Sequence, residues 1–321
     1  MSPRDVDWER RIGRQLKLRD LHVLMTVAQH GSMAKAASHL SVTQPAISQA
    51  IADLERAVGV QLVDRGPRGV QLTTYGEKLL GRATEAFDAL KQGMRDIEFL
   101  TEPGLGEVCI GADMSYIAGG FVAAIIRRVS DRHPRLSMQV IETTTSMAAP
   151  EFRELRERKV DLVLGRMSTP IVADDLNVEM LFDESIVVVT SAQSKWANRA
   201  EIDLADLSNE PWILAPSPNM ARELVENAFR RKGLEPPQPK VTTYSIQLRL
   251  QLLASGKYLT VFTDSTVRYS ADRWSLKIVP IDLGPRLPVV AVTLKHRTLP
   301  PAAELFIGEV RMATKALRKA R

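Results

Sequence analysis

The sequence predicts an α+β protein of several domains: a small helical N-terminal domain, a long connecting helix and a larger C-terminal α/β domain of two lobes. The 321 residues exceed what one domain of ordinary size needs. Three helical patterns follow one another between Lys17 and Val58, and after residue 106 apolar strands alternate with helices. The expected parts are residues 17–73, a helix over 74–100, a hinge at 101–106 and a domain at 107–321, with one lobe at about 107–167 and 268–321 and the other at about 168–267.

Composition indicates soluble globular material with a basic N-terminal region. Hydrophobic residues make up 45% and charged residues 25%, and the formal net charge is +5. The window from Arg10 to Gly76 alone holds nine Lys or Arg and four acidic residues, so an excess equal to that of the whole chain lies there. Such a region permits an anionic partner.

The N-terminal residues and the single cysteine exclude several classes of protein. Residues 1–16 lack the apolar segment of a secretory signal, and no apolar run approaches the ~18 residues of a membrane span. Cys109 alone forms neither an intrachain disulfide nor a Cys-rich metal site, and its apolar surroundings favour a buried position over a redox sensor. We therefore expect a cytoplasmic protein with no metal and no membrane partner.

Residues Ser32–Val58 have the pattern of a helix-turn-helix. A first helix stops at Gly31, a short Ala-rich helix starts at Ser32, and a longer helix starts near Thr43. The small side chains of the pair Ala36-Ala37 allow two helices to approach closely. The apolar residues of the longer helix repeat at spacings of four, three and four and share one face: Ile47, Ile51, Leu54 and Val58.

The opposite side of the longer helix carries the candidate DNA-reading residues. They are short or polar: Thr43, Gln44, Ala46, Ser48 and Gln49. In the major groove Gln pairs bidentately with adenine, and Ser or Thr serves several bases. Ser32, the expected N-cap of the shorter helix, is a further candidate. A solvated helix face is the alternative for such a pattern, so its surroundings must decide.

A hairpin is expected over Gln61–Leu72, around a turn rich in Gly and Pro. Its Arg65 and Arg68 are placed to hold the DNA backbone or minor groove, contacts that fix register more than they read sequence. A long helix then starts at Thr73, with apolar residues in a heptad seam: Leu80, Ala83, Phe87, Leu90, Met94 and Ile97. The seam predicts helix-mediated dimerisation, and packing of this helix on its own domain is the alternative.

The run from Leu18 to Leu80 resembles the winged helix-turn-helix of LysR-type transcriptional regulators. The resemblance rests on the Ala36-Ala37 pair, on "TQPAIS", on "LE..VG..LV.R" and on the "LT..G" that opens the long helix, and it continues in "GEVCIGAD", "HPRLSMQVIE" and "LRERKVDLVLGR". It implies a homodimer or homotetramer that binds a two-fold operator in double-stranded DNA through paired winged domains. It also implies a C-terminal effector domain like the type 2 periplasmic binding proteins, with a small molecule between its lobes. RNA polymerase is a further partner to consider.

The effector site is expected beyond the carboxyl ends of the strands, where ligands bind in open α/β sheets. By resemblance, Ser115, Thr145 and Arg166 match the two hydroxyls and the arginine that family members use for aromatic acids. Hydroxyls and an arginine fork suit a carboxylate, so we expect an acidic effector such as an aromatic or sugar acid. Weaker candidates for the same site are Thr144, Ser217 and Thr263. The alternatives are a salt bridge between lobes for Arg166 and helix capping for the hydroxyls of Ser115 and Thr145.

Two departures from the family and two rival functions complete the prediction. Met33 stands where the family often has a bulkier apolar residue, and Thr263-Asp264 where it often has Pro, which changes one wall of the site. The five His lack metal spacing, and no nucleophile elbow, P-loop or dinucleotide fingerprint is present, so no catalytic residue and no cofactor is expected. A transport binding protein, or a small-molecule binding module without DNA function, would account for the C-terminal half alone. The sequence therefore predicts a transcriptional regulator modulated by a small acid.

Overall fold

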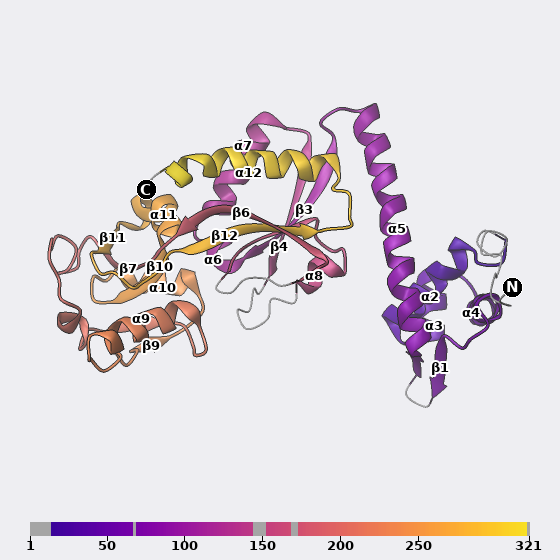
Figure 1. The fold of residues 1–321 in the computed structure, drawn as a ribbon, viewed down its shortest axis with the longest axis horizontal. Coiled ribbons are helices and arrows are strands. Elements are labelled where there is room, and N and C mark those ends of the chain that lie inside the picture. The colour runs from indigo at the N-terminus through magenta and orange to yellow at the C-terminus, as the bar shows by residue number, and fades with distance from the viewer. Residues whose placement is uncertain (1–13, 67–68, 144–151, 168–172, 320–321) are drawn as a thin grey trace, which may run out of the picture. The chain divides into compact units, whose positions relative to one another are not determined.

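The computed structural model describes residues 14–66, 69–143, 152–167 and 173–319. These form two compact units, and the boundary between them lies inside the long helix α5 (Thr74–Thr101) that Figure 1 labels. Unit 1 ends at Gly93 and unit 2 begins at Met94, which is earlier than the expected hinge at 101–106. The helix itself ends at Thr101, where that segment begins.

Unit 1 begins with three helices in the predicted order: α2 (Leu18–His30), α3 (Met33–Leu40) and α4 (Gln44–Val58). Ser32 Oγ accepts the backbone N–H of Lys35, and Thr43 Oγ1 accepts that of Ala46, each at 3.4 Å, so both hydroxyls are N-caps. Gly31 ends α2 in the left-handed conformation that glycine adopts without strain. The predicted helix-turn-helix is confirmed, because its start and stop residues act as the sequence indicates.

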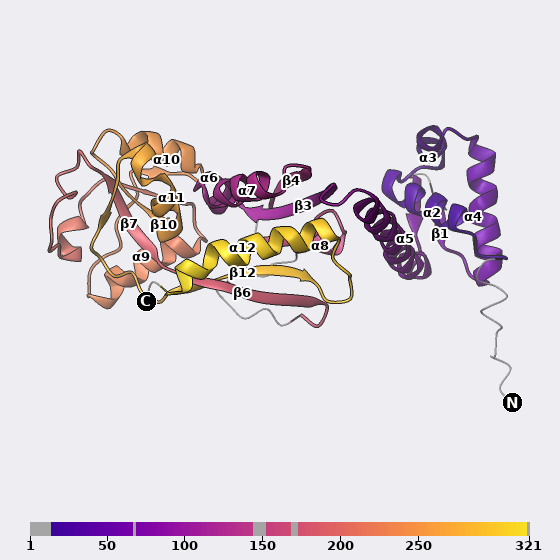
Figure 2. The same ribbon diagram turned by 90° about the horizontal axis from the view of Figure 1, so that it is seen from above.

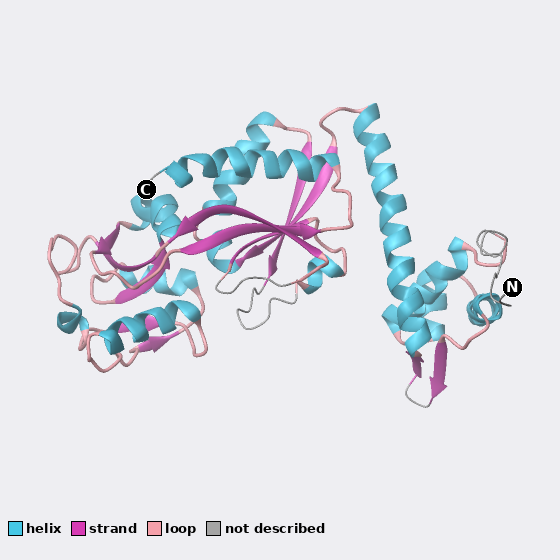
Figure 3. Cartoon of the chain, in the orientation of Figure 1, coloured by secondary structure: helices cyan, strands magenta, loops and turns pink. Residues whose placement is uncertain are grey.

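A hairpin follows α4 and is tied to it by a carboxylate. It consists of β1 (Val63–Gly66) and β2 (Gly69–Leu72), the pair of short arrows beside the helices in Figure 3. Oε1 of Glu55 accepts the N–H groups of Leu62 at 2.8 Å and Val63 at 3.3 Å, which fixes the path from α4 into β1. The buried apolar residues of this unit form one core. Unit 1 is therefore a winged helix-turn-helix.

Lobe I of unit 2 is built on a five-stranded mixed sheet with strand order β4-β3-β5-β12-β6. Its strands are β3 (Gly106–Asp113), β4 (Leu136–Thr143), β5 (Leu162–Arg166), β6 (Leu176–Glu184) and β12 (Leu287–Leu294). β12 runs opposite to the other four. Helices α7 (Phe121–Arg132) and α12 (Pro301–Lys319) pack on one face, and Figure 2 shows α12 along β6 and β12. Cys109 is buried on the other face, with the short helix α8 (Arg153–Arg156), as expected.

Lobe II is built on a second five-stranded sheet with strand order β11-β7-β10-β8-β9. Its strands are β7 (Ile186–Ser191), β8 (Trp212–Leu214), β9 (Val241–Thr242), β10 (Leu259–Thr263) and β11 (Leu276–Val279). Here β7 is the reversed strand. One core contains α9 (Met220–Arg231) and the 3-10 turn η1 (Leu204–Leu207), and the other contains α10 (Ile246–Leu253) and α11 (Asp264–Trp274). The predicted fold class is confirmed.

The chain passes between the lobes at Ser185 and returns between Val279 and Leu287. The expected lobe limits at 167/168 and 267/268 are therefore wrong, since β6 pairs within lobe I and β11 within lobe II. The segment between β3 and β4 contains two helices, α6 (Met114–Ala118) and α7, separated by Gly119-Gly120. A Cβ atom on Gly119 would lie 2.3 Å from Oγ1 of Thr266 in α11, so this turn has room only for glycine.

Candidate functional site

The start of α4 presents the polar edge that the sequence predicts. Thr43, Gln44, Ala46 and Gln49 are exposed and Ser48 is half-buried, whereas Ile47 and Ile51 lie in the core. Gln49 Nε2 donates to Asp53 Oδ1 at 2.8 Å, and Arg56 contacts the same oxygen at 2.7 Å. These hydrogen bonds lower the pKa of Asp53. Gln49 is thus oriented by its own helix, and Gln44 stands at the exposed first turn.

The hairpin is anchored to the turn between α2 and α3. The backbone N–H of Val70 donates to the carbonyl of Gly31 at 3.0 Å. Arg65 is exposed on β1, as a backbone-contacting residue must be. Arg68 lies outside the described residues. The cap hydroxyls of Ser32 and Thr43 accept backbone N–H groups, and each keeps its own hydrogen as a donor.

The heptad seam of α5 is divided between two roles. Ala83 is buried in the core of unit 1, so assigning this residue to a partner is wrong, whereas Phe87 packs against the same core and is half-buried. Leu80 is half-buried. Further along, large apolar side chains are exposed in a stripe: Leu90 51%, Met94 67%, Ile97 59% and Leu100 79%. Leu100 was not expected. Four large apolar side chains exposed on one helix form the kind of patch that marks a surface for interaction with another molecule.

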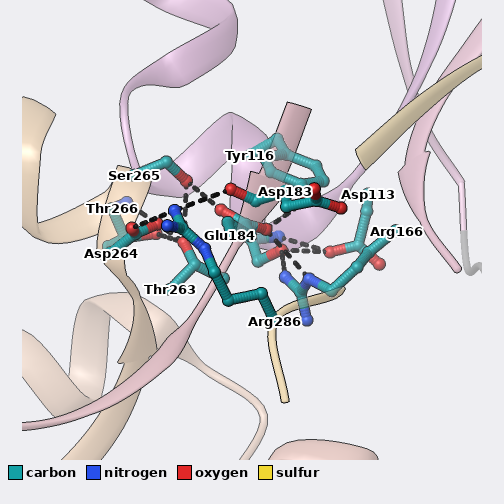
Figure 4. A network of polar contacts seen from close by, with 11 residues as sticks. Asp113, Tyr116, Arg166, Asp183, Glu184, Thr263, Asp264, Ser265, Thr266 and Arg286 are labelled. Carbon is teal, nitrogen blue, oxygen red and sulfur yellow. Dashed lines mark hydrogen bonds and ion pairs between the residues drawn. The ribbon is translucent and has the colours of Figure 1, made fainter. Parts of the chain in front are cut away.

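A buried polar network lies at the junction of the two lobes, and Glu184 is its centre (Figure 4). Arg166 Nε, from the end of β5, donates to Glu184 Oε1 at 2.9 Å, and the hydroxyl of Tyr116 in α6 donates to the same oxygen. The hydroxyl of Ser265 in α11 donates to Oε2 at 2.6 Å. The carboxylate therefore gathers donors from β5, α6 and α11.

The edges of this network contain two more of the predicted residues. Arg166 Nη2 donates to Ser115 Oγ at 3.2 Å, and the Ser115 hydroxyl donates to Asp113. Thr263 Oγ1 accepts the backbone N–H of Thr266 at 3.0 Å and so caps α11.

Electrostatics favour the charged form of the arginine. Burial disfavours the charged guanidinium of Arg166, but neighbouring acidic groups, among them Glu184 and Asp113, raise its pKa above the usual range. Burial also raises the pKa of Tyr116 well above its ordinary value, so its phenol stays protonated and acts as a donor. Burial and the nearby Glu184 raise the pKa of Asp264.

The structure thus brings Ser115, Arg166 and Thr263 into one region. Ser217 lies in the exposed loop after β8, and Thr144 and Thr145 lie outside the described residues. Arg166 forms a buried ion pair with Glu184, but both residues belong to the sheet of lobe I, so this pair is not the salt bridge between lobes that stood as the alternative. Ser115 does not act as the expected cap either, because Asp113 is the N-cap of α6 and accepts the backbone N–H of Ser115. Sequence reasoning missed Glu184 and Ser265. The signal for Glu184 was the acidic pair Asp183-Glu184 between two apolar strand segments.

Two family models together cover nearly the whole chain. The model described as LysR substrate binding domain matches residues 102–315. The model described as bacterial regulatory helix-turn-helix protein, lysR family, matches residues 18–77. The chain belongs to the LysR-type transcriptional regulators. This LysR-type regulator is therefore a DNA-binding transcriptional regulator with an effector-binding domain, and a binding module without DNA function is no longer a rival.

Curated relatives of this LysR-type regulator span most of its length. It is 28% identical over 302 residues to the HTH-type transcriptional regulator GbpR of Azospirillum brasilense, covering 94% of this chain and 87% of the relative. It is 29% identical over 297 residues to the HTH-type transcriptional regulator TdcA of Escherichia coli strain K12, covering 91% of each. These relatives are regulators and not enzymes.

Solved structures show the same fold over most of the chain. A full-length OxyR variant from Pseudomonas aeruginosa gives a TM-score of 0.66 at 21% identity, covering 95% of this chain and 98% of that one. Full-length CbnR in complex with its target DNA gives a TM-score of 0.61 at 21% identity, covering 93% and 100%. Among the described residues of this LysR-type regulator, every helix is too short or too polar to span a lipid bilayer.

Proposed function

We propose that this LysR-type regulator binds a two-fold operator as a homo-oligomer and that a small organic acid at the lobe junction controls this binding or the activation that follows. One observation carries the proposal: Glu184 is hydrogen-bonded to Arg166 of lobe I and to Ser265 of lobe II at the same time. An acid that engages Arg166 competes with Glu184 for it. The contact between the lobes then depends on whether the acid is bound.

The exposed stripe of α5 supports the homo-oligomer. Leu90, Met94, Ile97 and Leu100 offer one apolar face that a second copy of the same helix covers. A two-fold dimer places two α4 helices on two half-sites of the operator. Dimer and tetramer both satisfy this arrangement, and RNA polymerase is the partner class expected of an activator.

The contacts at the lobe junction suggest how a bound acid would change DNA binding. A ligand that binds one lobe arrangement better than the other shifts the population toward it. In an oligomer, that rigid-body change alters the spacing of the winged domains on DNA. The cap hydroxyls, Gln44 and Arg65 then keep their contacts only on a differently spaced operator.

The test begins with selection of bound duplexes from a random oligonucleotide pool. A two-fold symmetric consensus is expected, with an affinity that falls linearly with salt on a double logarithmic scale because phosphate contacts release counterions. Footprints are then taken with and without benzoate or gluconate. A footprint whose length is the same under every condition, together with an asymmetric consensus, would contradict the proposal.

A further inference from the structure

Arg249 on α10 is a buried arginine that has no acidic partner among the residues that the structure describes. Its exposed fraction is 9%, close to the 8% of Arg297, another buried arginine of unit 2. Arg297 lies 3.0 Å from Asp161, whereas within the described part of the chain no carboxylate lies within ion-pair distance of Arg249. Arg166, at the junction network, is already paired with Glu184. Arg249 therefore carries the buried positive charge that the described residues leave unbalanced.

Only weak partners hold the Arg249 guanidinium. Nη1 donates to the carbonyl of Val261 at 3.2 Å and Nη2 to that of Tyr244 at 3.4 Å. The guanidinium carbon lies 5.0 Å from the ring centre of Phe262. Nε is buried and has no hydrogen-bond partner among the described residues. A guanidinium has five N–H donors, so several here point to no strong acceptor.

This arginine lies in the helix that follows β9, near the carboxyl edge of the lobe II sheet, and ligands bind beyond such edges in open α/β sheets. Strands β8, β9 and β10 run parallel and end at the same edge. Of the two carbonyls that hold Arg249, that of Val261 lies in the middle of β10 and that of Tyr244 lies two residues after β9. The hydroxyl of Tyr244 reaches the carbonyl of Pro216 in the loop after β8, at 3.4 Å. Helix α10 packs against α6, which carries Ser115. Helix α10 therefore contacts the helix that supplies Ser115 and Tyr116 to the Glu184 network.

The buried guanidinium of Arg249 does not contribute to stability. Burying a charge without a counter-charge is unfavourable, and an apolar side chain of similar volume would suit this core better. Burial alone lowers the pKa of Arg249 to about 10, which leaves it a cation at neutral pH. An oxyanion on the guanidinium removes this penalty through charge-assisted hydrogen bonds.

We propose that Arg249 is the receptor for the carboxylate of a small organic acid at the lobe II side of the junction. The proposal rests on the acidic effector proposed above and assigns its anionic group to a residue that the sequence comparison did not indicate. Nε and a neighbouring Nη form the fork for the two carboxylate oxygens. Arg166 and Ser115 then contact the remainder of the molecule from lobe I.

The test uses the full-length protein and its thermal unfolding in sodium benzoate or sodium gluconate, at an ionic strength matched with sodium chloride. The variants are Arg249→Met, Arg249→Lys and the control Arg231→Met, which removes another lobe II arginine that donates to a backbone carbonyl. At least one acid should raise the melting temperature of the wild type and of the control. Arg249→Met should melt no lower than the wild type without ligand and should bind the acid about ten- to hundredfold more weakly.

The outcomes separate this inference from the proposed function. If an acid stabilises the wild type and Arg249→Met equally, the acidic effector stands and the role of Arg249 is overturned. If neither acid stabilises the wild type while operator binding persists, the carboxylate receptor is overturned and DNA binding stands. Should Arg249→Met fold poorly, Arg249→Lys decides: a weakened, saturable response supports the fork, and an unchanged response overturns it.

Discussion

Arg166 and Glu184 form an ion pair across an intervening strand. Arg166 ends β5 and Glu184 ends β6, and β12 lies between these strands in the sheet. The Nε–Oε1 distance is 2.9 Å, with side-chain exposures of 13% and 0%. Because Tyr116 and Ser265 also donate to Glu184, this carboxylate joins the sheet of lobe I to helices on both sides of the junction.

Glu184→Gln should destabilise unit 2 strongly. The amide keeps the shape but removes the charge that balances Arg166, and breaking a buried ion pair costs about 3 kcal/mol or more. Thermal unfolding of the full chain measures the effect. The matched control is Glu179→Gln, which breaks an exposed pair with Arg311 and should change stability by about 1 kcal/mol or less. Equal effects of the two variants would contradict a structural role for the junction.

Asp264→Asn should stabilise the protein at neutral pH. The raised pKa of Asp264 means that the native state holds this proton more tightly than the unfolded state does. The wild type therefore loses stability as pH rises from the ordinary Asp pKa of about 3.9 through the raised value, and the variant does not. The difference in melting temperature should vanish below about pH 4. The control is Asp272→Asn, exposed on the same helix, and a pH-independent gain in Asp264→Asn would argue against the mechanism.

The helix-turn-helix was predictable because its signals are local. Ser32, Thr43 and Gly31 are cap residues that act within three or four positions along the chain. Helix α11 was missed for the opposite reason: its buried face includes the polar Ser265, Thr266 and Ser270, which no hydrophobic pattern reveals. The break at Gly119-Gly120 was missed because the element that requires it, α11, lies far along the chain.

Only some residues of the effector region were predictable from the sequence. Ser115 and Arg166 follow strands that the sequence shows, so their neighbourhood could be inferred from the rule for strand ends. Their partner Glu184 could not, because it reaches Arg166 across β12, a strand that enters the sheet about a hundred residues later. The same holds for Arg249, because its sequence neighbours do not reveal that the described residues place no carboxylate within ion-pair distance of it.

Gly76→Ala should destabilise unit 1. A Cβ atom there would lie 2.1 Å from the carbonyl oxygen of Leu62, where α5 crosses the start of β1, and backbone must move to admit it. Overpacking of this kind costs about 1–3 kcal/mol. The control on the same helix is Gly81→Ala, whose Cβ meets nothing within 4 Å and should stabilise by about 0.5–1 kcal/mol. Scanning calorimetry of the full chain should show shifts of opposite sign, and shifts of the same sign would count against the model of this contact.

Met94→Glu should weaken self-association without unfolding the chain. Met94 is 67% exposed in the stripe of α5, so a charge there is tolerated by one copy and disfavoured in an apolar interface. Losing one such buried side chain is worth about 1.5–3 kcal/mol, or about ten- to hundredfold in the dimer Kd. Sedimentation velocity measures it, with Ala89→Glu, exposed on the same helix beside the stripe, as control. Identical association constants for the two variants would show that the apolar stripe of α5 does not form the interface.

Gln44→Ala should relax base preference at one position of each half-site by about 1–3 kcal/mol, because a bidentate amide contact in the major groove is lost. The salt dependence of binding should stay the same, since Gln44 neutralises no phosphate. Arg65→Ala should do the reverse, lowering the salt slope by about one while leaving base preference intact. Fluorescence anisotropy with single-base operator variants at several salt concentrations separates the two effects. Gln71→Ala, exposed on β2, is the control, and a Gln44 variant that behaves like it would show that another residue reads the base.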